Sequence, residues 1–175
     1  GGNIRYMDMG TDGSDAVNIG GPSGSRSLHL FDNNERLYIS TTGTGNRIAR
    51  VGSTSTPPKS GTHLLGNFPG YPTSSTSPNQ FVLFDTGTNN TPDLLYVADD
   101  SAGEILKYTF NNATSQWIAQ GSVSVPNIKS ITGKITSGVV TLYFTSIGSP
   151  SQLRTLSNAS GSSLTGTTIV NLQTA

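Results

Sequence analysis

A short strand-like segment beginning with Leu-Tyr occurs three times in this chain of 175 residues. The copies are Leu37-Tyr38-Ile39-Ser40, Leu95-Tyr96-Val97-Ala98 and Leu142-Tyr143-Phe144-Thr145. Each copy follows an apolar run and precedes two further strand-like segments. Self-similarity at a period of roughly 45–60 residues, with four strands per unit, is typical of β-propeller blades. The repeat therefore predicts an all-β chain built from four-stranded units.

The composition agrees with an all-β fold and excludes several functions. Ser, Thr and Gly dominate, and no convincing amphipathic helix is visible. Cysteine is absent, so the chain has no disulfide, thiolate zinc site or cysteine nucleophile. Only 11% of residues are charged and the net charge is zero, which argues against nucleic acid as a partner. No apolar run approaches the ~20 residues of a membrane span.

The repeat divides the chain into units within one domain, 1–175. We expect a β-propeller of about three four-stranded blades plus half of another, with the half blade at 1–21 and blades at 24–70, 79–124 and 126–175. The half blade would hold its third and fourth strands, Ile4–Met9 and Ala16–Ile19. The expected strands of the three blades are Ser27–Phe31, Arg36–Thr41, Ile48–Gly52 and Thr62–Phe68, then Gln80–Asp85, Leu94–Asp99, Glu104–Phe110 and Gln116–Val123, and finally Ile128–Ile135, Val139–Ser146, Gln152–Ser157 and Thr168–Leu172.

Three blades and a half cannot close a ring, because both ends would leave uncovered sheet faces and strand edges. We therefore expect the remaining propeller blades, from the same or another chain, as partners.

Superposing the third strands aligns four cations, Arg5, Arg50, Lys107 and Arg154. We interpret them as capping a solvated face between blades. The alternative is a ring of cations that lines a channel and binds an anion.

Three carboxylates near the strand ends of one blade, Asp85, Asp99 and Asp100, are candidate calcium ligands. The spacing is not that of an EF-hand, and Asp residues in blade turns commonly accept local backbone hydrogen bonds. A glycosidase-type carboxylate pair is a third interpretation. Calcium is thus the one candidate cofactor, and the sequence otherwise predicts none.

Trp117 is the only tryptophan and could stack on a sugar, although a tryptophan on a last strand more often covers the edge of a blade. Three Asn-x-Ser/Thr sequons lie in predicted turns, at Asn89, Asn112 and Asn158, and are candidate glycosylation sites. Two histidines without cysteine argue against zinc, and no Gly-x-Ser-x-Gly elbow supports a serine hydrolase.

Several segments form a pattern that extends over nearly the whole chain: Gly2-Asn3-Ile4-Arg5-Tyr6, Arg47-Ile48-Ala49-Arg50-Val51-Gly52, Phe81-Val82-Leu83-Phe84-Asp85, Asp93-Leu94-Leu95-Tyr96-Val97-Ala98-Asp99-Asp100, Gly103-Glu104-Ile105-Leu106-Lys107-Tyr108 and Trp117. Together they resemble a family of secreted or cell-surface β-propeller repeat proteins, found in multidomain bacterial surface proteins and in some eukaryotic microbes. The resemblance implies a propeller fold and brings no catalytic residues with it.

These observations predict a non-catalytic, extracellular or cell-surface structural or adhesive propeller module, with glycans or neighbouring subunits as further partners. A carbohydrate-binding propeller lectin is the first alternative. A propeller hydrolase or lyase that takes residues from a missing half is the second.

Overall fold

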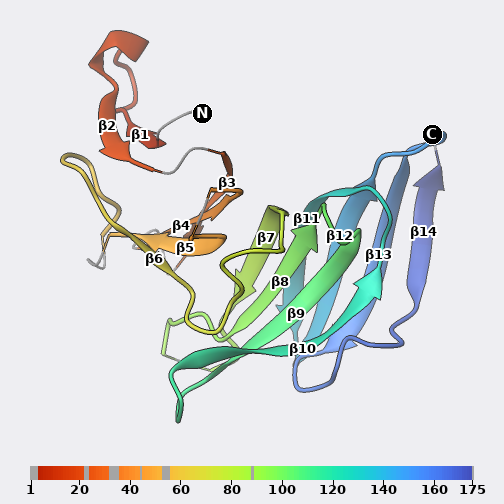
Figure 1. Ribbon diagram of the computed structural model, residues 1–175. Helices are drawn as coiled ribbons and strands as arrows, with labels where there is room; N and C mark the ends of the chain where they lie inside the picture. The colour runs from red at the N-terminus through yellow and green to blue at the C-terminus, as the bar shows by residue number, and fades with distance from the viewer. Residues whose placement is uncertain are drawn as a thin grey trace.

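The computed structural model describes residues 4–21, 24–31, 36–43, 45–52, 56–87 and 89–174, and the regular secondary structure of this part is almost entirely β-strand (Figure 1). One short 3-10 helix, η1 (Gly13–Asp15), interrupts the strands. No helix in these ranges has the length and apolar character needed to cross a bilayer. Residues 1–3, 32–35, 44, 53–55, 88 and 175 of the predicted units lie outside the described residues.

The strands form one two-stranded and three four-stranded antiparallel sheets, each a simple meander in chain order. Sheet A contains β1 (Ile4–Tyr6) and β2 (Val17–Gly20). Sheet B contains β3 (Ser25–Phe31), β4 (Arg36–Thr41), β5 (Ile48–Val51) and β6 (Leu65–Asn67). Sheet C contains β7 (Pro78–Phe84), β8 (Leu94–Asp99), β9 (Glu104–Asn111) and β10 (Gln116–Ser124). Sheet D contains β11 (Ile128–Thr136), β12 (Val139–Ser146), β13 (Gln152–Ala159) and β14 (Ile169–Thr174). The predicted all-β class, with three four-stranded units and a two-stranded one, is confirmed.

Consecutive sheets pack face to face through separate apolar cores. One core joins sheets A and B around Ile39, a second joins B and C around Tyr38, and a third joins C and D around Tyr96. The first strands β3, β7 and β11 also lie against one another, β7 contacting both of the others. This is how consecutive blades are arranged in a β-propeller, with first strands innermost. In Figure 1, sheet A and β14 lie at opposite ends of the row.

The Leu-Tyr repeat has a direct structural meaning, because side chains on a strand alternate between the two faces of the sheet. The leucine faces the preceding sheet and the tyrosine faces the following one. Tyr38 is 3% exposed and Tyr96 is fully buried, whereas Tyr143 in sheet D is 36% exposed. The repeated tyrosine is therefore buried only where another sheet follows it.

The opposite end of the row is also open. In sheet C, Phe81 and Leu83 on β7 face sheet B and are each 3% exposed. Ladder pairing places Leu28 and Leu30 at the same positions of β3, facing sheet A. These two leucines are 55% and 48% exposed, because sheet A covers β4, β5 and β6 but not β3.

Two elements are shorter than predicted, and hydrogen bonds explain both. The predicted strand Ile4–Met9 ends at Tyr6, since the carbonyl of Asp8 already accepts the Thr11 N–H in a turn. The predicted strand Thr62–Phe68 is reduced to β6, because the His63 N–H donates to Ile19 O of sheet A instead of to β5.

The predicted alignment of four cations is wrong for two of them. Arg50 pairs with Tyr38 and Lys107 with Tyr96, so both face the following sheet. In sheet D the residue paired with Tyr143 is Thr155, which puts Arg154 on the other face. Ile4 and Tyr6 of β1 pack on sheet B. Arg5 lies between them in the strand, so it is on the opposite face of sheet A, and it is exposed. A shift of one residue moves a side chain to the opposite face, and the four cations therefore form no ring.

Candidate functional site

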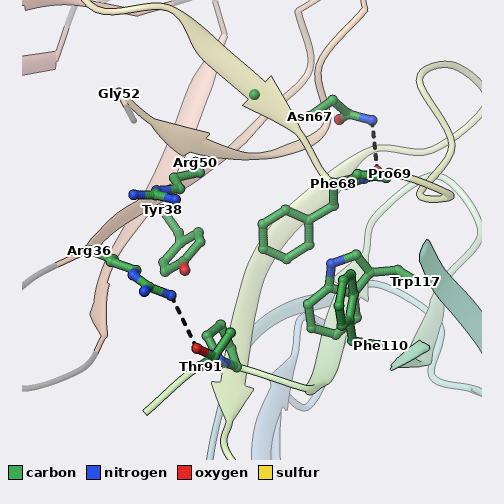
Figure 2. A pocket seen from close by; sticks show the side chains of 12 residues that line it. Arg36, Tyr38, Arg50, Gly52, Asn67, Phe68, Pro69, Thr91, Phe110 and Trp117 are labelled. Atoms are coloured by element: carbon green, nitrogen blue, oxygen red, sulfur yellow. Dashed lines mark hydrogen bonds between the residues drawn. The ribbon is translucent and has the colours of Figure 1, made fainter. Parts of the chain in front are cut away.

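A pocket of about 350 Å³ opens between sheets B and C (Figure 2). Sheet B supplies Tyr38 and Arg50, which face sheet C because they are cross-strand partners. Sheet C supplies Phe110 from the end of β9 and Trp117 from β10. The volume lies at the lower end of the range of roughly 300–1,000 Å³ found for small-molecule sites.

One side of the pocket is aromatic. The rings of Phe68 and Trp117 are stacked, with centroids 4.8 Å apart and planes inclined by 5°. The ring of Tyr38 meets that of Phe68 edge-on, with centroids 5.6 Å apart, and the ring centroids of Phe110 and Trp117 are 5.5 Å apart. Trp117 is only 4% exposed, because these neighbours cover it. The indole is therefore part of the core that forms this wall, and it is not an exposed platform for a sugar.

The other side of the pocket is polar. Arg36, at the start of β4, donates from Nη1 to Thr91 Oγ1 at 3.4 Å, which connects sheet B to the loop before β8. Asn67 donates from Nδ2 to the carbonyl oxygens of Phe68 and Tyr71, each at 3.2 Å. Among the described residues that line the pocket, two are arginines and none is a carboxylate.

The matching place between sheets C and D holds a buried lysine, and a smaller pocket of about 210 Å³ lies beside it, lined by Leu94, Thr109 and Ser160 among others. Lys107 Nζ donates to Asn158 Oδ1, to Ala159 O at 3.0 Å and to Ser162 O at 2.6 Å. Tyr96 Oη donates to the same Asn158 Oδ1 at 3.0 Å. Burial lowers the pKa of Lys107 to about 8. These contacts attach the end of β13 to sheet C.

Ladder pairing makes the two places equivalent. Tyr38 and Arg50 of sheet B correspond to Tyr96 and Lys107 of sheet C, as cross-strand pairs of the same kind. By the same register, Phe110 of sheet C corresponds to Asn158 of sheet D. Asn158 accepts two hydrogen bonds in the interface between sheets C and D. In the interface between sheets B and C its place is taken by Phe110, which lines the pocket of about 350 Å³.

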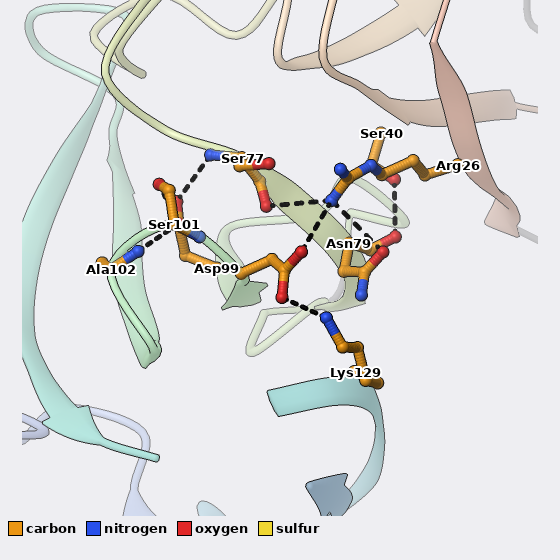
Figure 3. Close-up of polar contacts among 9 residues, drawn as sticks. Arg26, Ser40, Ser77, Asn79, Asp99, Ser101, Ala102 and Lys129 are labelled. Carbon is orange, nitrogen blue, oxygen red and sulfur yellow. Dashed lines mark hydrogen bonds and ion pairs between the residues drawn. The ribbon is translucent and has the colours of Figure 1, made fainter. Parts of the chain in front are cut away.

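A second cluster of polar residues joins three sheets at the start of their first strands (Figure 3). Asp100, just after β8, accepts from Lys129 of β11 through Oδ1 and lies 3.7 Å from Arg26 Nη1 of β3 through Oδ2. Arg26 also donates to Asn79 Oδ1 of β7 at 3.3 Å. Each of the three first strands has a register shift around its second residue, which is Arg26, Asn79 or Lys129. Such bulges redirect a side chain, here Arg26 and Lys129 toward the carboxylate of Asp100 and Asn79 toward Arg26.

The three candidate calcium ligands are not brought together. Asp99 is buried and accepts from Ser77 N, from Ser101 N and Oγ, and from Ala102 N. Asp85 accepts from Gly87 N, and Asp100 is held by its two cations. No group of three metal-binding side chains occurs within the described ranges. Each carboxylate has local partners of the kind expected for turns and sheet contacts.

The three sequons differ in accessibility. Asn89 and Asn112 are exposed, Asn112 in the turn between β9 and β10. Asn158 is 6% exposed; besides the hydrogen bonds to its Oδ1, its Nδ2 donates to Ser163 O at 3.0 Å. A glycan on this nitrogen would remove the contact with sheet C. The burial of Asn158 argues against a glycan at this sequon in the folded chain, and glycosylation at the three sites stays a prediction.

Sequence reasoning missed Arg36, Arg50 and Phe110 as residues of one site. No signal in the sequence groups these residues, because the equivalence of Phe110 and Asn158 follows only from the ladder pairs of the structure.

No protein-family model and no curated protein sequence matches this chain. Among solved structures, a similar one is an α-L-arabinofuranosidase of Clostridium thermocellum, with a TM-score of 0.48 and 16% sequence identity. The alignment covers 87% of this chain and 52% of that enzyme, so the chain spans about half of its length. This likeness concerns strand arrangement, and nothing about activity follows from it.

Proposed function

We propose that this chain is a non-catalytic, extracellular β-propeller module that acts as a structural or adhesive part of a larger assembly. The observation that carries the proposal is the exposure of Tyr143, at a position where Tyr38 and Tyr96 are buried by a following sheet.

The outer face of sheet D has the chemistry of an interface between sheets. Val139, Tyr143, Leu153 and Val170 are each between 36% and 51% exposed. Isolated apolar residues on a surface need no explanation, but the tyrosine belongs to a series whose other members are covered. The occupant of this face is a further four-stranded sheet of the same propeller, because that is what covers the equivalent face of sheets B and C.

A structural role is favoured over catalysis by the partners of the acidic residues. The side chains of Asp85, Asp93, Asp99 and Asp100 each accept hydrogen bonds or form ion pairs within the protein. An extracellular location is supported by the low charge and the exposed sequons at Asn89 and Asn112.

Tyrosine nitration followed by peptide mass spectrometry tests the proposal. In the recombinant 175-residue chain, Tyr143 should react and Tyr38 and Tyr96 should not. In the protein purified from its natural source, Tyr143 should be protected as well. Equal reactivity of Tyr143 in both preparations would contradict a covering sheet.

The non-catalytic part of the proposal is tested separately, on the naturally sourced protein. We expect no turnover of polysaccharides or carbohydrate esters, with or without added calcium. Turnover that is lost on chelation would instead support a calcium-dependent enzyme.

A further inference from the structure

We propose that a β-hairpin docks on the open edge of β1 and covers Leu28 and Leu30, and that the segment preceding residue 1 in the natural polypeptide supplies it. The hairpin would complete sheet A as a four-stranded sheet. This inference rests on the structural role proposed above, and it names the partner at the end of the row opposite to sheet D.

Contacts between neighbouring sheets show which strands cover a first strand. In sheet C, β7 is contacted by β3 and β4, the first two strands of sheet B. In sheet D, β11 is contacted by β7 and β8, the first two strands of sheet C. A first strand is thus covered by the first two strands of the sheet before it. By the same rule, β3 should be covered by the first two strands of sheet A.

The two strands of sheet A correspond to the other half of such a sheet. Ile4 of β1 and Ile19 of β2 share a core with residues of β4 and β5. β2 lies beside the segment that leads into β6, because His63 N–H donates to Ile19 O. Since β6 is the strand of sheet B farthest from β3, the other edge of sheet A, formed by β1, lies on the side of β3.

This edge of β1 can receive a strand. Among the described strands, β1 pairs only with β2. An unpaired edge presents a row of N–H and C=O groups that serves as a template for a further strand. Two strands added there would extend sheet A over β3, where the two leucines are exposed.

The exposed leucines have buried equivalents in the other sheets. Ladder pairing places Leu28, Phe81 and Ile131 at the same position of the three first strands. Phe81 is 3% exposed and Ile131 is 2% exposed, whereas Leu28 is 55% exposed. Leu30 is 48% exposed, and its equivalent Leu83 is 3% exposed. The same positions are therefore buried wherever the preceding sheet has its first two strands.

The covering strands also define the side chains that the hairpin should carry. On the first strand, the ring centroid of His29 lies 5.9 Å from that of Phe81, and Phe31 packs on the same core. On the second strand, the tyrosine of the Leu-Tyr pair, Tyr38 or Tyr96, is buried in the core with the following sheet. We expect an aromatic residue near the end of the first strand of the hairpin and a Leu-Tyr pair in the second.

Meander topology assigns the hairpin to the segment before β1. In the three four-stranded sheets the strands follow chain order, so the second strand leads directly into the third. Tyr38 lies before Ile48 of β5, and Tyr96 lies before Ile105 of β9, at nearly the same spacing. The tyrosine of the hairpin should precede Ile4 at a similar spacing.

A copy of the β3–β4 hairpin of this chain serves as the probe. Residues 25–41 are fused before residue 1 of a Leu28→Cys chain through a short Gly-Ser linker, and the added copy keeps its leucine, so the protein has one thiol. Tethering makes docking intramolecular. We therefore expect maleimide to label the thiol at least about tenfold more slowly than in the Leu28→Cys chain without the extension.

The control extension has the same length and carries Phe31→Asp and Tyr38→Asp in the added copy only. These changes remove the rings that would pack on β3, so labelling should be as fast as without an extension. Equal labelling with and without the unmodified extension, or equal protection by the control extension, would overturn the docking.

Tandem mass spectrometry of peptides from the naturally sourced protein tests where the hairpin comes from. The segment before residue 1 should contain the two strand patterns, with the Leu-Tyr pair in the second. A natural polypeptide without this pair of strands before residue 1 would overturn the proposal. None of these results bears on the open face of sheet D, which has its own test at Tyr143.

Discussion

Phe110 and Asn158 occupy equivalent positions in consecutive sheets, and they complete their interfaces in opposite ways. Asn158 accepts hydrogen bonds from a buried lysine and tyrosine, so its interface is closed by polar contacts. Phe110 contributes an aromatic ring to the wall of a pocket. The same position of the repeat therefore supplies a structural contact between sheets C and D and part of a candidate binding site between sheets B and C.

Replacement of Asn158 by leucine should be strongly destabilising. The buried ammonium of Lys107 and the Tyr96 hydroxyl would each lose an acceptor, and a buried polar group left without a partner costs about 1–3 kcal/mol. We expect a decrease of about 2–4 kcal/mol in the free energy of unfolding, measured by urea denaturation. Asn112→Leu, in an exposed turn, serves as the control and should change it by less than about 0.5 kcal/mol. A similar small effect at both positions would show that the Lys107 contacts do not hold the sheets together.

The stability of the chain should rise with pH just above neutrality. Lys107 has a folded-state pKa of about 8, against 10.5 as its ordinary value. Between these values the unfolded chain keeps a proton that the folded chain has lost, so the free energy of unfolding increases with pH. The window to measure runs from pH 8 to about 9.5, before tyrosines of the unfolded chain ionise near pH 10.

We expect a gain of about 1–2 kcal/mol over this window, from a slope of at most about 1.4 kcal/mol per pH unit. Lys107→Met provides the control, because it removes the titrating group and should remove the rise. A rise that persists in Lys107→Met would assign the effect to another group.

Neutralising Asp100 should weaken the contact among three sheets in a salt-dependent way. Asp100→Asn removes both ion pairs, and because all three groups are partly exposed the cost should be about 0.5–1.5 kcal/mol. The difference from wild type should shrink in about 1 M salt, which screens charges over roughly 3 Å. Asp85→Asn is the matched control, since an asparagine can still accept from Gly87 N. A cost that does not change with salt would contradict an electrostatic contact.

Secretion of the chain from a eukaryotic host should produce glycans selectively. Asn112 and Asn89 should be modified, because both side chains are exposed. Asn158 should remain unmodified in folded material, because its amide is buried in the interface with sheet C. Glycopeptide mass spectrometry distinguishes the three sites, and a folded product with a glycan on Asn158 would contradict this interface.

The strands could be predicted because alternation and turn residues are local signals. The segments at Arg36, Leu94 and Val139 begin and end where they were expected. The face of the sheet on which a side chain lies, and how exposed that side chain is, depend on contacts between distant segments and are not local properties. Arg154 differs from Lys107 by one step of register, which only the ladder with β12 fixes. Asn158 looks like a turn residue in the sequence, yet a lysine 51 positions earlier makes it part of the core.

The pocket was beyond sequence reasoning for a similar reason. Arg36, Asn67 and Phe110 come from two sheets, and their proximity depends on how those sheets pack. Trp117 could be singled out as an aromatic residue, but the ring of Phe68 that stacks on it could not.

The most direct test of the stacked-sheet account is the labelling rate of thiols at two equivalent positions, since the chain has no cysteine of its own. Leu28→Cys and Phe81→Cys introduce a thiol at the same position of β3 and β7. The account predicts that the thiol at position 28 reacts with maleimide almost as fast as a free thiol. It predicts that the thiol at position 81, covered by sheet B, reacts far more slowly until denaturant unfolds the chain. Equal rates at the two positions in native buffer would contradict the stacking of sheet B on sheet C and the open face before sheet B.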